Sequence, residues 1–306
     1  ADRIDTQVEL LGKTLAAPIV IAAMTGGTDR GGAINRELAG VAEERGYGFG
    51  LGSQRPLLNH PEDGSYQVRE VAPSCLVLGN LAGVQARDLS TAQVGELVRA
   101  VDADGICIHL SPAMELVQPG GDRDFTGVLA TFERLAQELD VPVLAKETGC
   151  GISPTVAQRL AAVGVRHLDV SGAGGTSWVA VETLRTSGGA AAVGEMLHDW
   201  GVPTAASVAF ARAAQPAFET IIATGGISTG LDIARAIALG AHAAGLARPV
   251  LMAQQAGGRE AVTALFDRIE HELRSVMLLV GASTVAELRR SPFIVGESLA
   301  RWLALR

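Results

Sequence analysis

The sequence predicts an α/β fold, a (β/α)8 TIM barrel that forms a single domain over residues 1–306. Eight short apolar runs recur along the chain, and each is followed by a turn signal and a stretch with helical apolar spacing. Several runs are continuously apolar, as expected for strands that are covered on both faces. No GxGxxG motif follows the first run, so an open doubly wound sheet is the weaker alternative.

The predicted strands share this apolar character and end in polar or glycine-rich turns. They lie near residues 18–24, 47–53, 75–80, 104–110, 141–147, 166–172, 220–226 and 241–247.

Amphipathic helices are predicted between these strands. The first places Ile34, Leu38 and Val41 on one face. Another begins after a Ser153 cap and ends at Gly164. The chain from about residue 250 onward is predicted to be helical, and residues 185–195, RTSGGAAAVGE, are predicted to form a mobile loop.

Composition excludes several classes of function. The formal net charge is -8 and no basic run is interleaved with aromatic residues, so nucleic acid is not an expected partner. No uninterrupted apolar stretch is long enough to span a membrane and no signal peptide opens the chain, so a cytoplasmic protein is expected. Cys75, Cys107 and Cys150 are far apart, which is typical of buried thiols in a reducing compartment.

Polar residues and glycines collect where the predicted strands end, which is where TIM barrels place their chemistry. The last two strand ends carry Gly225, Gly226 and Ala247. These loops are predicted to bind a phosphate through backbone N–H groups and a helix N-terminus. A tight turn followed by a helix cap is the alternative for the stretch TGGISTG.

Lys146 ends an apolar strand, where a lysine is costly unless an anionic partner is near. It could form a Schiff base, or it could be a cation that faces an electron-rich cofactor. The structural alternative is a salt bridge with Glu147.

Eight motifs occur in a fixed order along the chain: MTGGT, GLGSQR, GNLAGVQ, HLSPAMELVQPGGDRDF, KETGCGIS, DVSGAGGTSW, WGVPTA and TGGISTGLDIARAIALGA. Together they resemble the type 2 isopentenyl-diphosphate delta-isomerases of isoprenoid biosynthesis, over residues 4–292. The resemblance implies an FMN-dependent isomerase of a prenyl diphosphate. It further implies that FMN, reduced by NADPH or another donor, serves as an acid–base catalyst with no net redox change. A homo-oligomer, either a tetramer or an octamer, is also implied.

The resemblance assigns cofactor contacts position by position. The ring and ribityl chain of FMN would meet Met24, Thr25, Ser53, Asn80, Lys146, Ser171 and Thr176. Its phosphate would meet Gly225, Gly226 and Ala247. Lys146 would lie near the N1/C2 side of the ring, where a cation stabilises the reduced anionic flavin.

The resemblance also assigns the substrate side. Arg55 and His109 would bind the diphosphate, and Glu115 would hold a Mg²⁺ that bridges to its oxygens. Gln118 would line the same pocket. The residues nearest the reaction would be Lys146, His109, Glu115 and the residue at position 114.

Several positions depart from the family pattern. Ser111 replaces an Asn, Met114 a Gln and Gly120 a Glu, while Ala206 and Ser228 stand where Glu and Arg are common. These changes are expected to cluster on the substrate side. The family's N-terminal Arg-Lys segment, which helps to clamp the diphosphate, has no counterpart in this sequence, and a piece of chain could precede its ADRID start.

Met114 leaves two main hypotheses open, because a thioether cannot donate a proton. The first is an isopentenyl-diphosphate isomerase that tolerates the change. The second is a diverged enzyme that acts on a longer prenyl substrate, as a proton-initiated terpene cyclase or by a double-bond shift. A 2-hydroxy-acid oxidase is a weaker third hypothesis, because residues 171–178 supply neither the His base nor the Arg of that class. A catalytically silent flavin- or phosphate-binding protein is the fourth.

Overall fold

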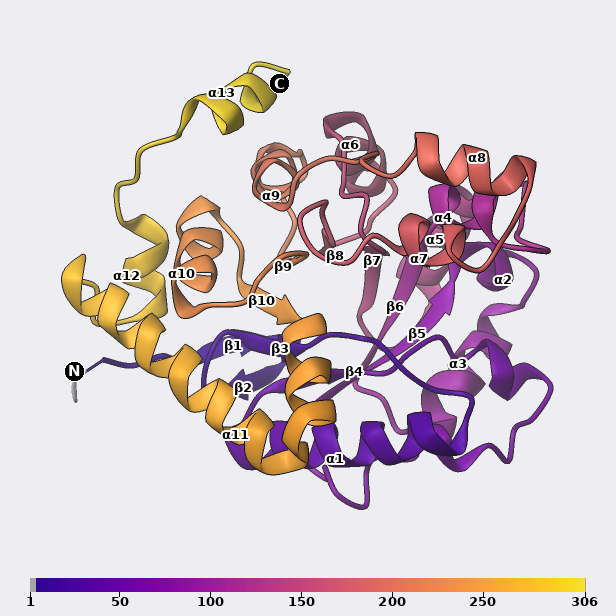
Figure 1. Ribbon diagram of the computed structural model, residues 1–306, viewed down its shortest axis with the longest axis horizontal. Helices are drawn as coiled ribbons and strands as arrows, with labels where there is room; N and C mark the ends of the chain where they lie inside the picture. The colour runs from indigo at the N-terminus through magenta and orange to yellow at the C-terminus, as the bar shows by residue number, and fades with distance from the viewer. Residues whose placement is uncertain (1–3, 306) are drawn as a thin grey trace.

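Eight parallel strands close into a barrel in the computed structural model, which describes residues 4–305 (Figure 1). The barrel strands are β3 (Ile19–Ile21), β4 (Gly48–Gly50), β5 (Leu76–Ala82), β6 (Gly105–Leu110), β7 (Val143–Glu147), β8 (His167–Asp169), β9 (Thr220–Thr224) and β10 (Ala243–Leu246). Each strand pairs with the next in chain order, and β10 closes against β3. Each overlaps one predicted run, so the (β/α)8 barrel is confirmed and the open sheet is wrong. The first three residues of the ADRID start lie outside the described part.

Helices surround the barrel in the order expected for strand–helix units. They include α1 (Asp29–Arg45), α2 (Gly83–Arg87), α3 (Thr91–Ala100), α5 (Val128–Glu138), α6 (Pro154–Ala162), α9 (Thr204–Ala213) and α10 (Gly230–Leu239). The predicted face of α1 is buried, and Ser153 caps α6 as expected.

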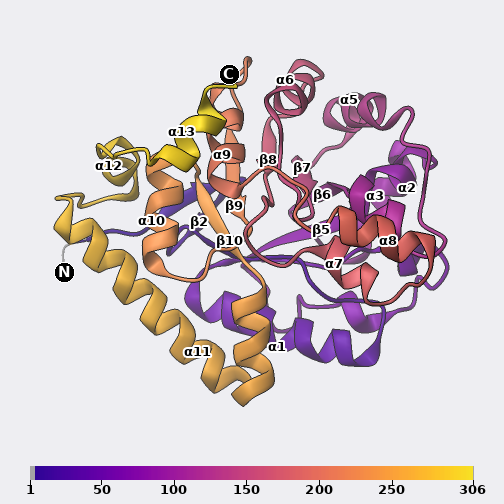
Figure 2. The same cartoon turned by 45° about the horizontal axis from the view of Figure 1, so that its top comes forward.

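The C-terminal part of the chain is helical, as predicted. It consists of α11 (Arg248–Leu279), α12 (Val285–Arg290) and α13 (Glu297–Leu303). Helix α11 bends sharply at Gly257 and Gly258, and Gly258 has the left-handed φ of 58° that favours glycine. Helices α1 and α11 lie side by side (Figures 1 and 2). No helix within residues 4–305 combines the length and the apolar character that crossing a membrane would require.

An antiparallel hairpin of β1 (Val8–Leu10) and β2 (Lys13–Leu15) closes the N-terminal end of the barrel. Its Leu10 and Leu15 pack against inward-facing strand residues such as Leu76 and Leu144. Each hairpin strand has only three residues, too few for an alternating pattern to be recognised in the sequence.

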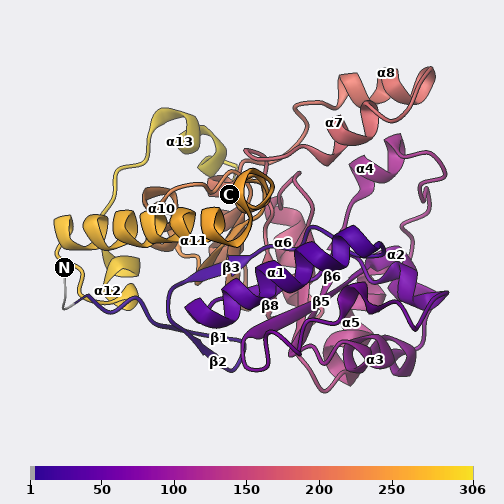
Figure 3. The ribbon, with the colours of Figure 1, turned by 60° about the horizontal axis from the view of Figure 1, so that its bottom comes forward.

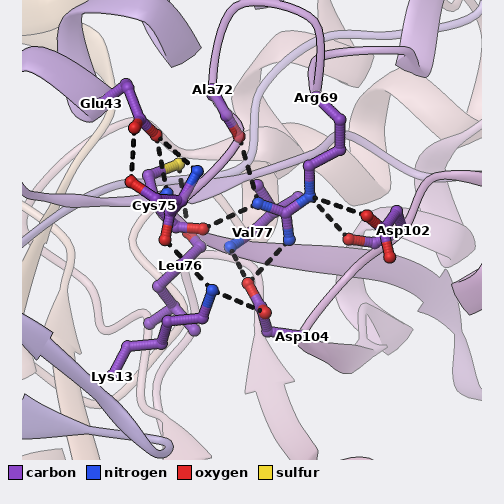
Figure 4. Close-up of polar contacts among 10 residues, drawn as sticks. Lys13, Glu43, Arg69, Ala72, Cys75, Leu76, Val77, Asp102 and Asp104 are labelled. Atoms are coloured by element: carbon purple, nitrogen blue, oxygen red, sulfur yellow. Dashed lines mark hydrogen bonds and ion pairs between the residues drawn. The ribbon is translucent and has the colours of Figure 1, made fainter.

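A polar network anchors this hairpin to the barrel (Figure 4). Lys13 forms an ion pair with Asp104 at 3.0 Å, and Asp104 also accepts from Arg69 and from the Val77 N–H, both at 2.8 Å. Burial alone would raise the pKa of Asp104, but the Val77 N–H and the two cations hold that pKa below its usual value.

Three short helices stand together at the opposite, C-terminal end (Figure 3): α4 (Pro112–Val117), α7 (Trp178–Thr183) and α8 (Gly189–Met196). The prediction of a loop over residues 185–195 was therefore wrong from Gly189 onward, while residues 185–188 do connect α7 with α8. The Ala-rich part of this segment has high helix propensity, and α8 packs closely on α7, since a Cβ at Gly194 would collide with Thr183.

Candidate active site

Two adjoining cavities open at the C-terminal end of the barrel. The central cavity, of about 490 Å³, lies over the strand ends. The side cavity, of about 730 Å³, lies between the start of α1, the 3-10 helix η1 (Arg55–Leu58) and α4. Five residues line both cavities and mark the boundary between them: Met24, Ser53, His109, Met114 and Gln118.

A buried ion pair forms part of the barrel wall beneath the central cavity. Lys146 on β7 and Asp169 on β8 are register partners, and Lys146 Nζ donates to Asp169 Oδ2 at 2.8 Å. Each side chain is only 8% exposed. Burial alone would lower the pKa of Lys146, but the Asp169 carboxylate raises it above its ordinary value. A lysine held protonated is a poor nucleophile, so the pair favours a cation that faces a cofactor over a Schiff base.

The structural alternative for Lys146, a salt bridge with Glu147, was wrong. Adjacent residues of a strand point to opposite faces, and the Glu147 carboxylate turns away from the barrel interior. There it accepts the backbone N–H groups of Thr148 and Cys150, both at 2.6 Å. Its burial raises its pKa to about 7 in spite of these bonds.

His109 lies beside Lys146 on β6, at the boundary of the two cavities. Its Nδ1 is 2.7 Å from Asn80 Oδ1. Because an amide oxygen accepts hydrogen bonds, we assign the proton to Nδ1, which leaves Nε2 as an acceptor. Burial and the nearby Lys146 cation lower the pKa of His109 to about 4, so the ring is neutral at neutral pH.

The predicted cofactor residues gather around the central cavity, with one exception. It is lined by Met24, Ser53, Asn80, Lys146, Ser171, Thr176, Gly225, Gly226 and Ala247. Thr25 lies in the side cavity, where its hydroxyl donates to Asn35 Oδ1 at 2.7 Å.

The N-terminus of α11 opens onto the central cavity. Ala247 provides no side-chain cap for this helix, and Arg248 follows it at the cavity wall. A helix N-terminus beside a cation is a ready anion site, which fits the expected phosphate. Helix α10 differs, because Asp232 accepts the Ser228 and Thr229 N–H groups, so TGGISTG does contain a helix cap.

Four predicted substrate-side residues line the side cavity: Arg55, His109, Glu115 and Gln118. Arg30 and Arg185 line it too, so it carries several cationic groups. Ser111 lines neither cavity, and its hydroxyl lies behind Glu115, 3.5 Å from Oε1.

Glu115 is a buried carboxylate at this site, and its Oε2 accepts the Asp122 N–H at 2.9 Å. Across residues 4–305 no group of three or more His, Cys, Asp or Glu side chains could hold a metal ion. Glu115 therefore has no set of partner side chains of these types with which to hold a metal ion.

The departures from the family pattern do not cluster as expected. Of the substituted positions, Met114 lines both cavities and Ser228 lines the central cavity. Ala206 is fully buried in α9, and Gly120 occupies an open turn at a φ of 70°.

Three residues of the central cavity or its surroundings were assigned no role from the sequence: Asp169, Glu182 and Thr224. Asp169 and Glu182 could have been noticed, because each places a carboxylate inside an apolar segment of the sequence. Carboxylates are rarely buried in such segments. Glu182 lines the cavity from α7 and pairs with Arg185 at 2.9 Å. Thr224 ends β9 directly before the glycine pair.

The comparisons with known proteins agree with this geometry. The family of FMN-dependent dehydrogenases matches residues 114–295. The isopentenyl-diphosphate delta-isomerases of Methanothermobacter thermautotrophicus and Pyrococcus abyssi are each 42% identical to this chain, over 100% of it and 85% of their own length. A solved structure of a mandelate oxidase variant with a monooxide FMN adduct superposes with a TM-score of 0.67. It covers 96% of this chain and 84% of its own at 18% identity, a likeness that shows the fold alone.

Proposed function

The chain belongs to the FMN-dependent, type 2 isopentenyl-diphosphate delta-isomerase family, and from this premise we propose that it interconverts isopentenyl and dimethylallyl diphosphate with no net redox change. One observation carries the proposal. A cavity with a protonated lysine in its wall adjoins a second cavity that combines cations with a carboxylate.

The central cavity suits FMN in three respects. Lys146 offers a cation to the electron-rich ring, Asn80 and Ser171 offer polar groups beside it, and the start of α11 suits the phosphate. Bound there, reduced FMN would supply the acid–base chemistry of the isomerisation, with NADPH as the proposed source of electrons. Asp169 keeps Lys146 charged, so that the cation persists in a buried position.

The side cavity suits a diphosphate. Arg55 can form charge-assisted hydrogen bonds to phosphate oxygens, and Glu115 would hold a Mg²⁺ whose charge offsets that of the diphosphate. His109 can donate to the same group only after Nε2 gains a proton. The negative charge of a bound diphosphate favours that protonation, because it raises the pKa of the ring.

Met114 lies between the proposed cofactor and substrate sites. Its thioether offers no proton donor and only a weak acceptor, so proton transfer at the reacting carbons does not pass through this side chain. Its polarizable surface can instead lie against a cationic or hydrocarbon part of the substrate.

Met114 also favours a second candidate function, a proton-initiated terpene cyclase or a double-bond shift on a longer prenyl diphosphate. Protonation of an alkene would give a carbocation, an internal alkene would close the ring, and loss of a proton would restore neutrality. An apolar wall at position 114 would spare such a cation from early deprotonation.

Anaerobic turnover with isopentenyl diphosphate tests the first proposal. The holoenzyme would be assayed by NMR with oxidised FMN and with FMN reduced by NADPH or dithionite, each with Mg²⁺ or with chelator. Of these four conditions, we expect dimethylallyl diphosphate only from the reduced enzyme in the presence of Mg²⁺. Equal turnover by the oxidised enzyme would contradict the proposal, and so would no turnover under any condition.

A further inference from the structure

Two buried side-chain atoms lack a hydrogen-bond partner in the described part of the chain: Thr224 Oγ1 and His167 Nδ1. They lie at opposite ends of the barrel wall, because His167 begins β8 and Thr224 ends β9. Thr224 lines the central cavity although its residue is only 6% exposed. The Oγ1 atom itself is sealed from solvent in this conformation, so it meets a group in the cavity when the side chain turns about χ1. Because a buried hydroxyl without a partner is costly, a group that enters the cavity is expected to draw it into a hydrogen bond.

Polar groups next to the Thr224 side chain are already paired with other partners. The Thr224 carbonyl accepts the Gly172 N–H at 2.8 Å. The neighbouring Thr204 hydroxyl is itself committed to the Gly225 carbonyl at 2.7 Å. The unpartnered atom is the side-chain oxygen of the last residue of β9, and neither of these two groups is free to pair with it.

Gly245 on β10 is the register partner of Thr224. A Cβ built on Gly245 would collide with Thr224 Oγ1. The φ of Gly245 is not in the left-handed region, so backbone conformation does not require a glycine here. The missing side chain instead leaves the room in which the Thr224 hydroxyl sits.

We infer that the Thr224 hydroxyl hydrogen-bonds to FMN in the central cavity, and that Gly245 provides the space for it. This inference rests on the proposed placement of FMN there. A hydroxyl can both donate and accept, so it can pair with the many acceptor atoms of the flavin, the ribityl chain or the phosphate.

Titration of the apoprotein with FMN, followed by flavin fluorescence, tests the inference without any substrate. Thr224→Val keeps the shape of the side chain and removes the hydroxyl, and Thr224→Ser keeps the hydroxyl. We expect Thr224→Ser to bind FMN within about 3-fold of wild type and Thr224→Val to bind about 5- to 150-fold more weakly, the range for an unmade buried hydrogen bond. Wild-type affinity in Thr224→Val would overturn the inference and assign the hydroxyl to water.

A double-mutant cycle tests the role of Gly245. Gly245→Ala should weaken FMN binding because the new methyl group displaces the Thr224 side chain. The pair Thr224→Ala with Gly245→Ala should then bind FMN no more weakly than Thr224→Ala does. Additive losses would contradict the steric link. Circular dichroism of each variant checks that it is folded before its affinity is compared.

Arg248→Ala separates this inference from the proposed placement of FMN. Arg248 is exposed at the start of α11 and lines the central cavity. If Arg248→Ala weakens FMN binding while Thr224→Val does not, the hydroxyl contact alone is refuted. If neither substitution changes the affinity, FMN does not occupy the central cavity, and the proposed site fails as well.

Discussion

Lys146 and Asp169 form an ion pair across adjacent strands, with 2.8 Å between Nζ and Oδ2, beneath the central cavity. Neither group would be stable alone in this position, because an unpaired charge is costly to bury. The pair places a permanent cation at the cavity wall, and it does so through residues 23 positions apart in the chain.

Removing the carboxylate should destabilise the protein. We expect Asp169→Asn to lower the free energy of unfolding by about 3–5 kcal/mol, because a buried charge loses its partner. Urea denaturation at neutral pH measures this. The pair Lys146→Met with Asp169→Leu should recover much of the loss, since it leaves no buried charge; a double variant as unstable as Asp169→Asn would contradict the account.

The ion pair of Lys146 and Asp169 also makes the stability of the protein depend on pH. The pKa of Lys146 is raised in the folded protein, so its contribution to stability is complete below the unfolded lysine pKa of about 10.4. That contribution is lost only as the pH rises through the folded value. Wild type should therefore lose stability in this alkaline window, relative to the Lys146→Met, Asp169→Leu variant. Parallel curves for the two proteins would contradict the assignment.

Met114→Gln should restore an amide between the two cavities. If proton transfer limits the isomerase, kcat should rise by about 10-fold or more. The rise should not exceed the usual contribution of a positioned proton-transfer group. Met114→Leu is the matched control, because it keeps an apolar side chain of similar size and should leave kcat nearly unchanged. An unchanged kcat in Met114→Gln would show that position 114 takes no part in proton transfer.

Arg55 should matter for the diphosphate and not for the fold. Arg55→Ala should raise KM by about 10- to 150-fold, the range for a lost hydrogen bond to a charged group. Arg36 is the control, since it is also exposed but lines neither cavity and donates to the Gly64 carbonyl at 3.5 Å. Arg36→Ala should keep the wild-type KM, and equal effects of the two substitutions would argue against a diphosphate in the side cavity.

Asp104 should affect stability alone, because it lies at the opposite end of the barrel from the cavities. Asp104→Asn should lower the free energy of unfolding by about 1.5–3 kcal/mol, since its carboxylate accepts from Arg69, Lys13 and the Val77 N–H. Asp102 is the control: its side chain is 87% exposed and lies 3.6 Å from Arg69. Asp102→Asn should change stability by about 0.5 kcal/mol or less.

The pKa of Asp104 is depressed, so its contribution is present above the unfolded Asp pKa of about 3.9 and is lost as the pH falls through the folded value. Wild type and Asp104→Asn should therefore converge in stability in acid. A difference that persists there, or a changed KM in Asp104→Asn, would contradict this placement.

The barrel could be predicted from the sequence because its strands are continuous apolar runs with polar ends, and those ends converge in any such barrel. The same rule predicted that Lys146, Ser171 and Gly225 would meet at one cavity. The partner of Lys146 could not be predicted in this way. Asp169 becomes its neighbour only through the register of β7 with β8. Glu147 is nearer in sequence, but its carboxylate accepts the Thr148 and Cys150 N–H groups instead.

Other differences have similar causes. Thr25 lies next to Met24 in the chain, yet its hydroxyl is held by Asn35 in the side cavity. The orphan hydroxyl of Thr224 depends on an absent side chain at Gly245, which the sequence alone gives no reason to connect with it.

Incubation of the enzyme with reduced FMN and Mg²⁺ in D2O, without oxygen, tests the central claim most directly. Isopentenyl and geranylgeranyl diphosphates would be supplied separately, and products identified by NMR and mass spectrometry. We expect deuterium-labelled dimethylallyl diphosphate from the short substrate. An unchanged short substrate together with a deuterated ring product from the long one would contradict it, and would identify the enzyme as a cyclase.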